Sequence, residues 1–382
     1  MLQYLEQFAS FFGPLRLFGY TSSRCLGALL TAFVLMLVVM PPLIRWLKRQ
    51  RFGEQGGKGQ GAAVVDNMRQ AKAGTPTMGG LGIVFCIVVT SLLWCVPTEP
   101  KVWLCLVALL AFAFLGFIDD RTKIWRGSKG MPGKWKLLLQ ILFGLGLGAW
   151  FLQIDHIKQV LEITQSAGKD VPTYKEFVGG YVVLPFLKNA WYFVGWGMIL
   201  WILLLSFCCS NGVNFTDGLD GLAGGTMFIA TIAFTVIAFV ASNFKYAHFL
   251  SIPYVPGGEE IAVLAAAIAG ACLGFLWFNS HPAEVFMGDT GSQALGGVLT
   301  MVAACTKQEF LIPVVGFVFM VEALSVGLQV ASFKMTGKRI FLCAPIHHHF
   351  QYKGWPETKI VLRFWLVAAL AALLALSTLK LR

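Results

Sequence analysis

Four clusters of polar residues interrupt an otherwise apolar sequence, and each supplies groups that bind phosphate or a metal ion. The clusters are the pair Asp119 and Asp120, the run 211–222 with Asn211, Asn214, Asp217 and Asp220, the segment Phe286–Ser292 with Asp289, and the triplet His347, His348 and His349. A Mg²⁺ ion takes a few carboxylates and completes its coordination with water and substrate phosphates. In phosphoryl transfer the protein mostly positions groups and neutralises charge. The clusters therefore predict a Mg²⁺-dependent phosphoryl-transfer site.

Each cluster also has a structural interpretation, which the residues alone leave open. Asp220 and Asp289 each precede an apolar run, so either can cap a helix. Adjacent carboxylates at the C-terminal end of a helix oppose the helix dipole, which favours a cation beside Asp119 and Asp120. The three histidines suggest zinc, but consecutive side chains cannot all reach one ion from a helix or strand. Diphosphate binding and positioning is therefore the preferred interpretation of the triplet.

The composition indicates a chain that is solvated largely by lipid. Hydrophobic residues make up 57% of the 382 residues and charged residues 13%, whereas a soluble domain carries about 25% charged residues. The nine cysteines lie mostly in apolar runs and are interpreted as small buried hydrophobic residues. Residues 1–20 lack the pattern of a cleaved signal peptide, so the first apolar run is expected to stay in the mature protein.

Apolar runs predict an all-α polytopic membrane protein with about ten transmembrane helices. The predicted spans are 24–44, 79–97, 102–118, 137–154, 190–210, 221–243, 261–280, 290–306, 310–333 and 360–379. No linker divides the chain, so residues 1–382 are expected to form a single integral membrane domain. Glycine clusters within several spans favour close helix packing.

Basic residues predict the orientation of the spans, because Lys and Arg gather in cytoplasmic loops. The loops after the first, third and ninth predicted spans are the basic ones, with Arg45 to Lys72, Arg121 to Lys136 and Lys334 to Lys359. Both termini are then expected on the periplasmic side, and all four polar clusters lie in a cytoplasmic active-site cleft. In the long outer segment 155–188, residues 174–177 and 181–186 suggest a small periplasmic β-hairpin.

Two polar residues fall inside the predicted span 310–333. Glu322 is a functional candidate by default because ionisable groups are costly at membrane depth. It also has a structural interpretation, as an internally paired group that orients helices. Gln329 lies nearer the cytoplasmic end and is the better candidate for a substrate contact. The sequence contains no Gly-x-x-x-x-Gly-Lys-Ser/Thr loop, which excludes a P-loop ATPase.

The order of the motifs resembles the polyprenyl-phosphate N-acetylhexosamine-1-phosphate transferase superfamily, and within it most closely the phospho-N-acetylmuramoyl-pentapeptide transferase (MraY) family. The motifs that carry the resemblance are Lys72–Gly80, Asp119-Asp120 with Lys123, the run 211–222, Phe286–Ser292, and Ala344–Phe350 followed by Lys353-Gly354-Trp355. Two features depart from the family pattern. Gln351 stands where a glutamate is expected, and the outer segment 155–188 is longer than usual.

The resemblance implies a fold of ten helices, usually a homodimer, in the bacterial inner membrane. It implies that UDP-MurNAc-pentapeptide and undecaprenyl phosphate react to give lipid I and UMP, with Mg²⁺ as cofactor, in peptidoglycan biosynthesis. By position it assigns Mg²⁺ binding to Asp289 and catalytic roles to Asp119, Asp120, Asp289 and His347. It assigns substrate contacts to Lys72, Thr77, Lys123, Lys136, Asn211, Asn214, Asp217, Asp220, Phe286, Gln329, His348 and His349.

Other mechanisms and functions stay open at this point. The lipid phosphate could attack the donor directly, or one Asp could first form a covalent phospho-sugar intermediate. A related transferase would use UDP-GlcNAc as its donor. A transporter of lipids or nucleotide sugars is a further alternative, but transporters concentrate polar residues near the bilayer midplane and have repeated halves. Here the polar residues gather on one face, and the sequence has no evident internal repeat.

Overall fold

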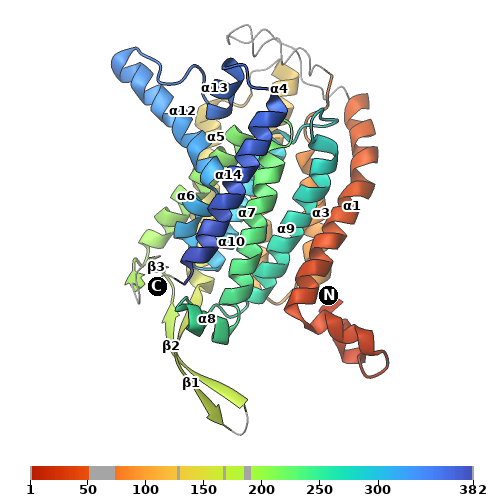
Figure 1. Cartoon of the computed structure of the whole chain (residues 1–382), viewed down its shortest axis with the longest axis vertical. Helices are drawn as coiled ribbons and strands as arrows, with labels where there is room; N and C mark the ends of the chain where they lie inside the picture. Colours follow the sequence, from red (N-terminus) through yellow and green to blue (C-terminus); the bar gives the residue numbers. More distant parts are fainter. Residues whose placement is uncertain (1, 51–73, 127–129, 167–168, 185–190, 381–382) are drawn as a thin grey trace.

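The fold is a bundle of long helices (Figure 1). The computed structural model describes residues 2–50, 74–126, 130–166, 169–184 and 191–380. The α-helices are α1 (Thr21–Arg49), α3 (Gly80–Trp94), α4 (Pro100–Arg126), α5 (Gly133–Ile154), α6 (Gly197–Thr216), α7 (Leu222–Ala241), α8 (Phe244–Leu250), α9 (Gly258–Asn279), α10 (Gly288–Cys305), α11 (Ile312–Val315), α12 (Phe317–Thr336), α13 (Ile346–Tyr352) and α14 (Glu357–Thr378). Short 3-10 helices are η1 (Leu2–Phe8), η2 (Gly13–Gly19) and η3 (Glu309–Leu311).

The helices confirm a polytopic membrane protein. Among the described residues, eight helices are long and apolar enough to cross a membrane, namely α1, α4, α5, α6, α7, α9, α12 and α14. The other two predicted spans, 79–97 and 290–306, also coincide with helices. They correspond to α3, which has 15 residues, and to α10, which has 18. α3 is short and apolar, and α10 carries several polar residues. The polytopic architecture is thus confirmed, whereas the count of about ten spans stays a prediction.

Helix α10 lies at the centre of the bundle. Every residue from 290 to 305 is buried, and the helix packs against α3, α4 and α6. A Cβ atom added to Gly116 of α4 would lie 2.1 Å from the backbone oxygen of Asp289, so the absence of a side chain lets the two helices touch. Protein rather than lipid surrounds α10, so its polar residues can meet polar partners. This explains why α10 is less apolar than the eight helices named above.

Several predicted boundaries were wrong. The predicted span 190–210 begins too early, because residues 191–193 form a strand and α6 extends to Thr216. The predicted span 310–333 is broken at Gly316 into α11 and α12. Helix α4 continues to Arg126, so Asp119 and Asp120 lie within the helix and not at its end. Runs of apolar residues mark the lipid-facing length, whereas helices continue into the polar ends of the bundle.

The predicted hairpin was also wrong in its position. Strand β1 (His156–Ser166) pairs antiparallel with β2 (Lys169–Val178), and a separate pair joins β3 (Tyr181–Val183) to β4 (Trp191–Phe193). The Gly179-Gly180 dipeptide therefore connects two different sheets instead of forming the hairpin turn. Both of these glycines have positive φ, which explains the reversal of the chain there.

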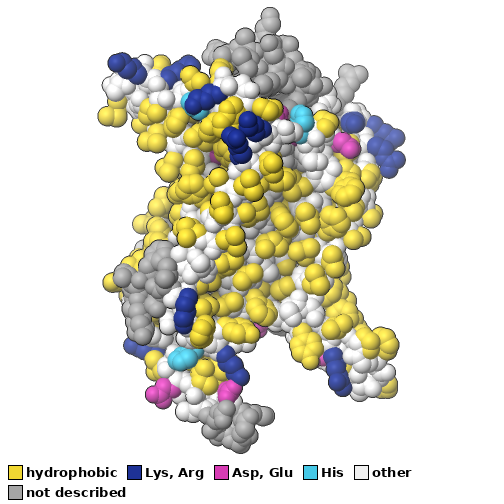
Figure 2. Space-filling model, in the orientation of Figure 1, with side chains coloured by type: hydrophobic (Ala, Val, Ile, Leu, Met, Phe, Trp, Pro, Cys, Tyr) yellow, Lys and Arg dark blue, Asp and Glu magenta, His cyan; other side chains and the backbone are white. Residues whose placement is uncertain are grey.

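The two ends of the bundle differ (Figure 1). Both termini lie on the side of the bundle from which the β1–β2 hairpin projects, whereas α13 and the end of α4 lie at the opposite end. On the face seen in Figure 2, hydrophobic side chains form a broad belt between two ends that carry the Lys and Arg side chains. The arrangement fits a molecule that crosses a bilayer, with its termini on one side.

Candidate active site

The first turn of α10 lies beside the segment before α3. The Phe286 backbone N–H donates to the Pro76 oxygen over 2.8 Å, and the Gly79 N–H donates to the Phe286 oxygen over 2.8 Å. The Gly80 N–H continues the ladder by donating to the Met287 oxygen over 2.9 Å. Two of the predicted motifs are therefore neighbours in space. Lys72, at the start of the first motif, lies outside the described residues.

Three predicted site residues converge on Gly288, where α10 begins. A Cβ atom added to Gly288 would lie 2.8 Å from Oδ2 of Asp120 and 2.9 Å from Oγ1 of Thr77. Its φ of +75° also favours glycine. The Gly288 N–H donates to Oδ2 of Asp217 over 3.1 Å. Burial, followed by the nearby Asp289 and Asp120 carboxylates, raises the pKa of Asp217 well above its usual value.

Asp120 caps α10. Its Oδ1 accepts from the Asp289 N–H over 3.1 Å, while Oδ2 accepts from the N–H of Thr290 over 2.9 Å and from its hydroxyl over 2.7 Å. The side chain is buried, and its negative charge lies at the favourable N-terminal end of the α10 dipole. This geometry assigns Asp120 the task of fixing the start of α10.

Asp119 and Asp289 share two lysines. Lys123 Nζ lies 2.7 Å from Oδ1 of Asp289 and 3.0 Å from Oδ2 of Asp119. Lys136 Nζ lies 2.8 Å from Oδ2 of Asp289 and 3.3 Å from Oδ2 of Asp119. The Lys123 side chain is 40% exposed and that of Lys136 20%, whereas both carboxylates are largely buried. Two acids held together by cations at a solvent-accessible edge form a site that attracts a cation or a phosphate.

The donor atoms of this group suit Mg²⁺. Asp119 and Asp289 offer carboxylate oxygens, which a hard cation prefers. Gln293, four residues after Asp289, also donates to Oδ2 of Asp289 over 3.3 Å. A bound cation would take over the place of an ammonium group beside these oxygens, and the lysines would then be available to substrate phosphates.

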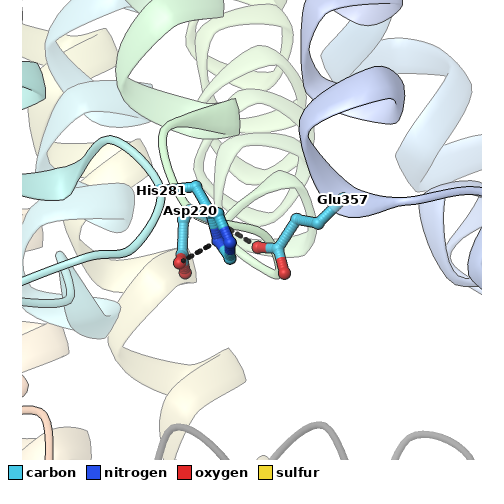
Figure 3. Close-up of side chains that lie close together, drawn as sticks. All are labelled: Asp220, His281 and Glu357. Carbon is cyan, nitrogen blue, oxygen red and sulfur yellow. Dashed lines mark hydrogen bonds and ion pairs between the residues drawn. The ribbon is translucent and has the colours of Figure 1, made fainter.

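Asp220 belongs to a second group, with His281 and Glu357 (Figure 3). Asp220 Oδ2 accepts from the Ala283 N–H over 3.2 Å and lies 3.1 Å from Nδ1 of His281. Glu357 Oε1 accepts from the Asp220 N–H over 2.7 Å. One atom from each of the three side chains lies within 4.8 Å of the others, so this group also could hold a metal ion. Its hydrogen bonds join the turn after α6, the segment before α10 and the start of α14.

Asn211 and Asn214 lie within α6 and not in a loop, because that helix extends to Thr216. The Asn211 Nδ2 group donates to the Phe207 oxygen over 2.8 Å and to Oε1 of Gln140 over 3.3 Å. The Asn214 Nδ2 group donates to Oγ of Ser292 over 2.9 Å. These amides therefore hold α6 against α5 and α10, and Asn214 touches the α10 turn that carries Asp289.

Gln329 holds the connection between α12 and α13. Its Oε1 accepts from the N–H groups of Ile340 and Phe341 over 3.1 and 2.9 Å. Its Nε2 group donates to the Phe341 oxygen over 3.1 Å. Both ends of the amide are thus occupied by backbone, and the structure gives Gln329 a role in shaping this connection.

The three histidines of α13 have different surroundings. His347 is fully buried, and its Nδ1 lies 3.1 Å from Oε2 of Glu322. His348 Nδ1 lies 2.7 Å from Oε1 of Gln351, and His349 Nδ1 accepts from the Leu342 N–H over 3.1 Å. Only His348 and His349 are partly accessible. The triplet therefore combines one buried member with two that can meet a substrate.

The structure brings part of the predicted site together. Asp119, Asp120, Lys123, Lys136, Asp217, Asp289 and Thr77 surround the start of α10, while Asp220, Asn211 and Gln329 form separate contacts. Sequence reasoning missed Thr290, Gln293, His281 and Glu357. The helical spacing of four residues from Asp289 could have indicated Gln293. An isolated histidine and a glutamate far along the chain gave no such signal.

The fold and this site define a polytopic membrane protein of the glycosyl transferase family 4 class, whose profile matches residues 102–307. The chain is 43% identical over 376 residues to the phospho-N-acetylmuramoyl-pentapeptide-transferase of Desulfotalea psychrophila, covering 97% of both chains. Identity to the proteins of that name from Maridesulfovibrio salexigens and Methylacidiphilum infernorum is 42% and 40%, covering 97% and 100% of this chain and 96% and 100% of those proteins. The chain therefore belongs to the phospho-N-acetylmuramoyl-pentapeptide transferase family.

Proposed function

We propose that this protein transfers phospho-MurNAc-pentapeptide from UDP-MurNAc-pentapeptide to undecaprenyl phosphate, giving lipid I and UMP in peptidoglycan biosynthesis. The observation that carries the proposal is the group formed by Asp119, Asp289, Lys123 and Lys136 at one end of a membrane bundle. It lies within the region that the family profile matches. Membership of the family, whose relatives bear the name of this reaction, supports the choice of substrates.

The reaction we propose is a direct displacement. An oxygen of the lipid phosphate attacks the β-phosphorus of the donor, which bears the sugar, and the bond from that phosphorus to the bridging oxygen of UMP breaks. Lys123 and Lys136 lie where they can neutralise the charge that spreads over the phosphate oxygens. The rival route, through a phospho-sugar bound covalently to an Asp, predicts a labelled adduct when donor is supplied without lipid.

Within the acidic pair, Asp119 is the better candidate for accepting the proton of the lipid phosphate. Asp120 already accepts three hydrogen bonds from the first turn of α10. Asp119 accepts one backbone hydrogen bond, from Met131 over 2.7 Å, and its other oxygen faces the two lysines. The proposed division of labour is that Asp120 positions α10 and Asp119 acts on the acceptor.

Mg²⁺ is the proposed cofactor, with Asp289 as its main ligand. When bound, the ion would neutralise charge on the diphosphate and assist the departure of UMP. The remaining substrate contacts are proposed from the family pattern and stay predictions, including Lys72, Phe286, His348 and His349. Phe286 is half-buried beside Gly79, where an aromatic ring has the chemistry to stack on uracil.

The proposed location is the bacterial inner membrane, with the site facing the cytoplasm and both termini in the periplasm. The basic residues around the site support this orientation. Lys123, Lys136 and the basic ends of α1 and α12 are examples. A homodimer is proposed from the family resemblance.

The test is release of UMP by the purified protein in detergent, with UDP-MurNAc-pentapeptide and undecaprenyl phosphate, and with or without Mg²⁺. Release that requires both the lipid and Mg²⁺ is the expected result. Release of UMP from UDP-GlcNAc in place of the muramyl donor would change the proposed donor substrate but leave the assignment to the superfamily intact. Binding of the donor without release from either donor would favour a transporter.

A further inference from the structure

Glu322 and His347 form an isolated pair inside the molecule. Glu322 lies in α12 and His347 in α13, and neither has any measurable exposure to solvent. His347 Nδ1 lies 3.1 Å from Oε2 of Glu322. Among the described residues, both carboxylate oxygens of Glu322 and both ring nitrogens of His347 lack a hydrogen bond, so this close approach is the one polar contact that joins them. Removing one member of a buried pair leaves the other without compensation, so each requires the other.

The other edge of the imidazole touches the turn after α6. A Cβ atom added to Gly218 would lie 2.3 Å from Nε2 and 2.7 Å from Cε1 of His347. Within 4 Å of that position, the three nearest atoms all belong to this ring. Gly218 does not have the positive φ that calls for glycine. Among the described residues, the imidazole of His347 is therefore what excludes a side chain at Gly218.

The turn that rests on His347 also carries Asp217. Oδ2 of Asp217 accepts from the Gly288 N–H, one residue before Asp289. A continuous line of contacts thus leads from Glu322 in α12, through His347 and the turn at Gly218, to the first turn of α10. The line ends beside the Asp289 carboxylate that both lysines touch.

We propose that the Glu322–His347 pair is a positioning device. Glu322 holds Nδ1 of His347, and the ring in turn fixes the position of the 217–220 turn relative to the start of α10. His347 then acts through Asp217 and does not exchange a proton with a substrate. The full burial of its ring supports this role. The proposal deepens the proposed function, because the site that the pair positions is the one assigned there to phosphate transfer.

Two substitutions of His347 separate the positioning role from proton transfer. Asparagine places an N–H donor close to the position of Nδ1 and leaves the space at Nε2 empty, whereas glutamine reaches toward Nε2 and leaves Nδ1 without a replacement. Contact between the Nε2 edge and the 217–220 turn predicts that His347→Gln, which fills that edge, retains the higher kcat/KM by about tenfold over His347→Asn. The opposite order, or an equal loss of kcat in both variants, would overturn the proposal.

Gly218 provides an independent test of the same contact. Gly218→Ala should lower kcat/KM by about tenfold in the natural sequence but by less than about twofold in the His347→Asn background, where the colliding atoms are gone. An equal loss in both backgrounds contradicts the contact. Gly327→Ala is the matched control, because Gly327 is exposed on α12 and a Cβ atom there meets nothing within 4 Å.

The apparent unfolding temperature, measured on each full-length variant in detergent without ligand, keeps this proposal separate from the proposed function. Glu322→Ala, His347→Gln and their double variant should show non-additive losses, with the double variant no less stable than the worse single one. Glu322→Gln, which keeps an acceptor for Nδ1, should lose least. Additive losses would overturn the pairing. If the natural protein released no UMP, these temperatures would still decide whether the pair exists.

Discussion

The two groups of ionisable side chains at the start of α10 and at the start of α14 are neutralised in different ways. Asp119 and Asp289 face the ammonium groups of Lys123 and Lys136, which are flexible and partly exposed. In the group Asp220, His281 and Glu357, backbone N–H groups supply two of the contacts. Flexible ammonium groups can give way to a metal ion or turn toward a phosphate, whereas backbone donors cannot move away. The comparison indicates chemistry at the first group and chain positioning at the second.

Asp289→Asn should have the largest effect, because it removes the charge that both lysines contact and that would hold Mg²⁺. We expect a loss of about 10³-fold in UMP release. The affinity of the purified variant for Mg²⁺, measured by calorimetry, should fall together with the rate of UMP release. An active variant with natural Mg²⁺ dependence would place the chemistry elsewhere.

Asp119→Asn and Asp120→Asn should separate catalysis from capping. Asp119→Asn is expected to lower kcat by about 10²-fold while leaving the unfolding temperature close to the natural value. Asp120→Asn keeps one oxygen acceptor but loses part of the cap of α10, so its folded state should be destabilised by about 1–3 kcal/mol. Measuring both quantities on both variants tests the assignment, and a reversed pattern would exchange the two roles.

Lys136→Met should have a moderate effect. The substitution keeps the apolar length of the side chain but removes a charge that lies between Asp119 and Asp289. We expect KM for the nucleotide donor to rise by about tenfold, because a charge-assisted contact to phosphate is lost. Steady-state kinetics with varied donor gives this value, and Lys134→Met, on the neighbouring exposed position, is the control. An unchanged KM would mean that Lys136 serves only to neutralise the two acids.

Glu357→Gln should have the smallest effect. Glutamine keeps an oxygen that can accept from the Asp220 N–H, so the turn after α6 should stay in place. We expect less than about threefold loss of kcat/KM, in keeping with the small cost of conserving a hydrogen bond. A loss as large as that of Asp289→Asn would show that the second group takes part in the chemistry, and the comparison between the two groups would fail.

The sequence predicted the helical membrane architecture well, because long apolar runs have few other solutions. Its motifs also identified Asp119, Asp289 and Lys123 as neighbours. The different contacts of Asp119 and Asp120 could not be predicted from the sequence, because adjacent residues point in different directions only once α4 is placed against α10. The partners of Asp220, namely His281 and Glu357, are distant in the chain and come together only through tertiary packing.

The same limits apply to the polar residues inside the predicted span 310–333 and to the predicted hairpin. Gln329 was expected to contact substrate, but its amide is taken up by the backbone at Ile340 and Phe341. The position of the β-hairpin was wrong because alternation in short segments does not fix which strands pair. The position of Glu322 within an apolar run makes it a functional candidate. Its partner, His347, cannot be predicted from the sequence because the two residues meet only where α13 lies against α12.

The burial of α10 has a consequence for how the molecule is made. A helix of 18 residues that has an aspartate as its second residue and contains Thr290, Ser292 and Gln293 is poorly suited to enter lipid alone. Helices α3, α4 and α6, which surround it, are all synthesised earlier in the chain. During biogenesis we therefore expect α10 to insert between helices that are already in the membrane. The carboxylates of α4 and α10 would then meet only at that late stage of assembly.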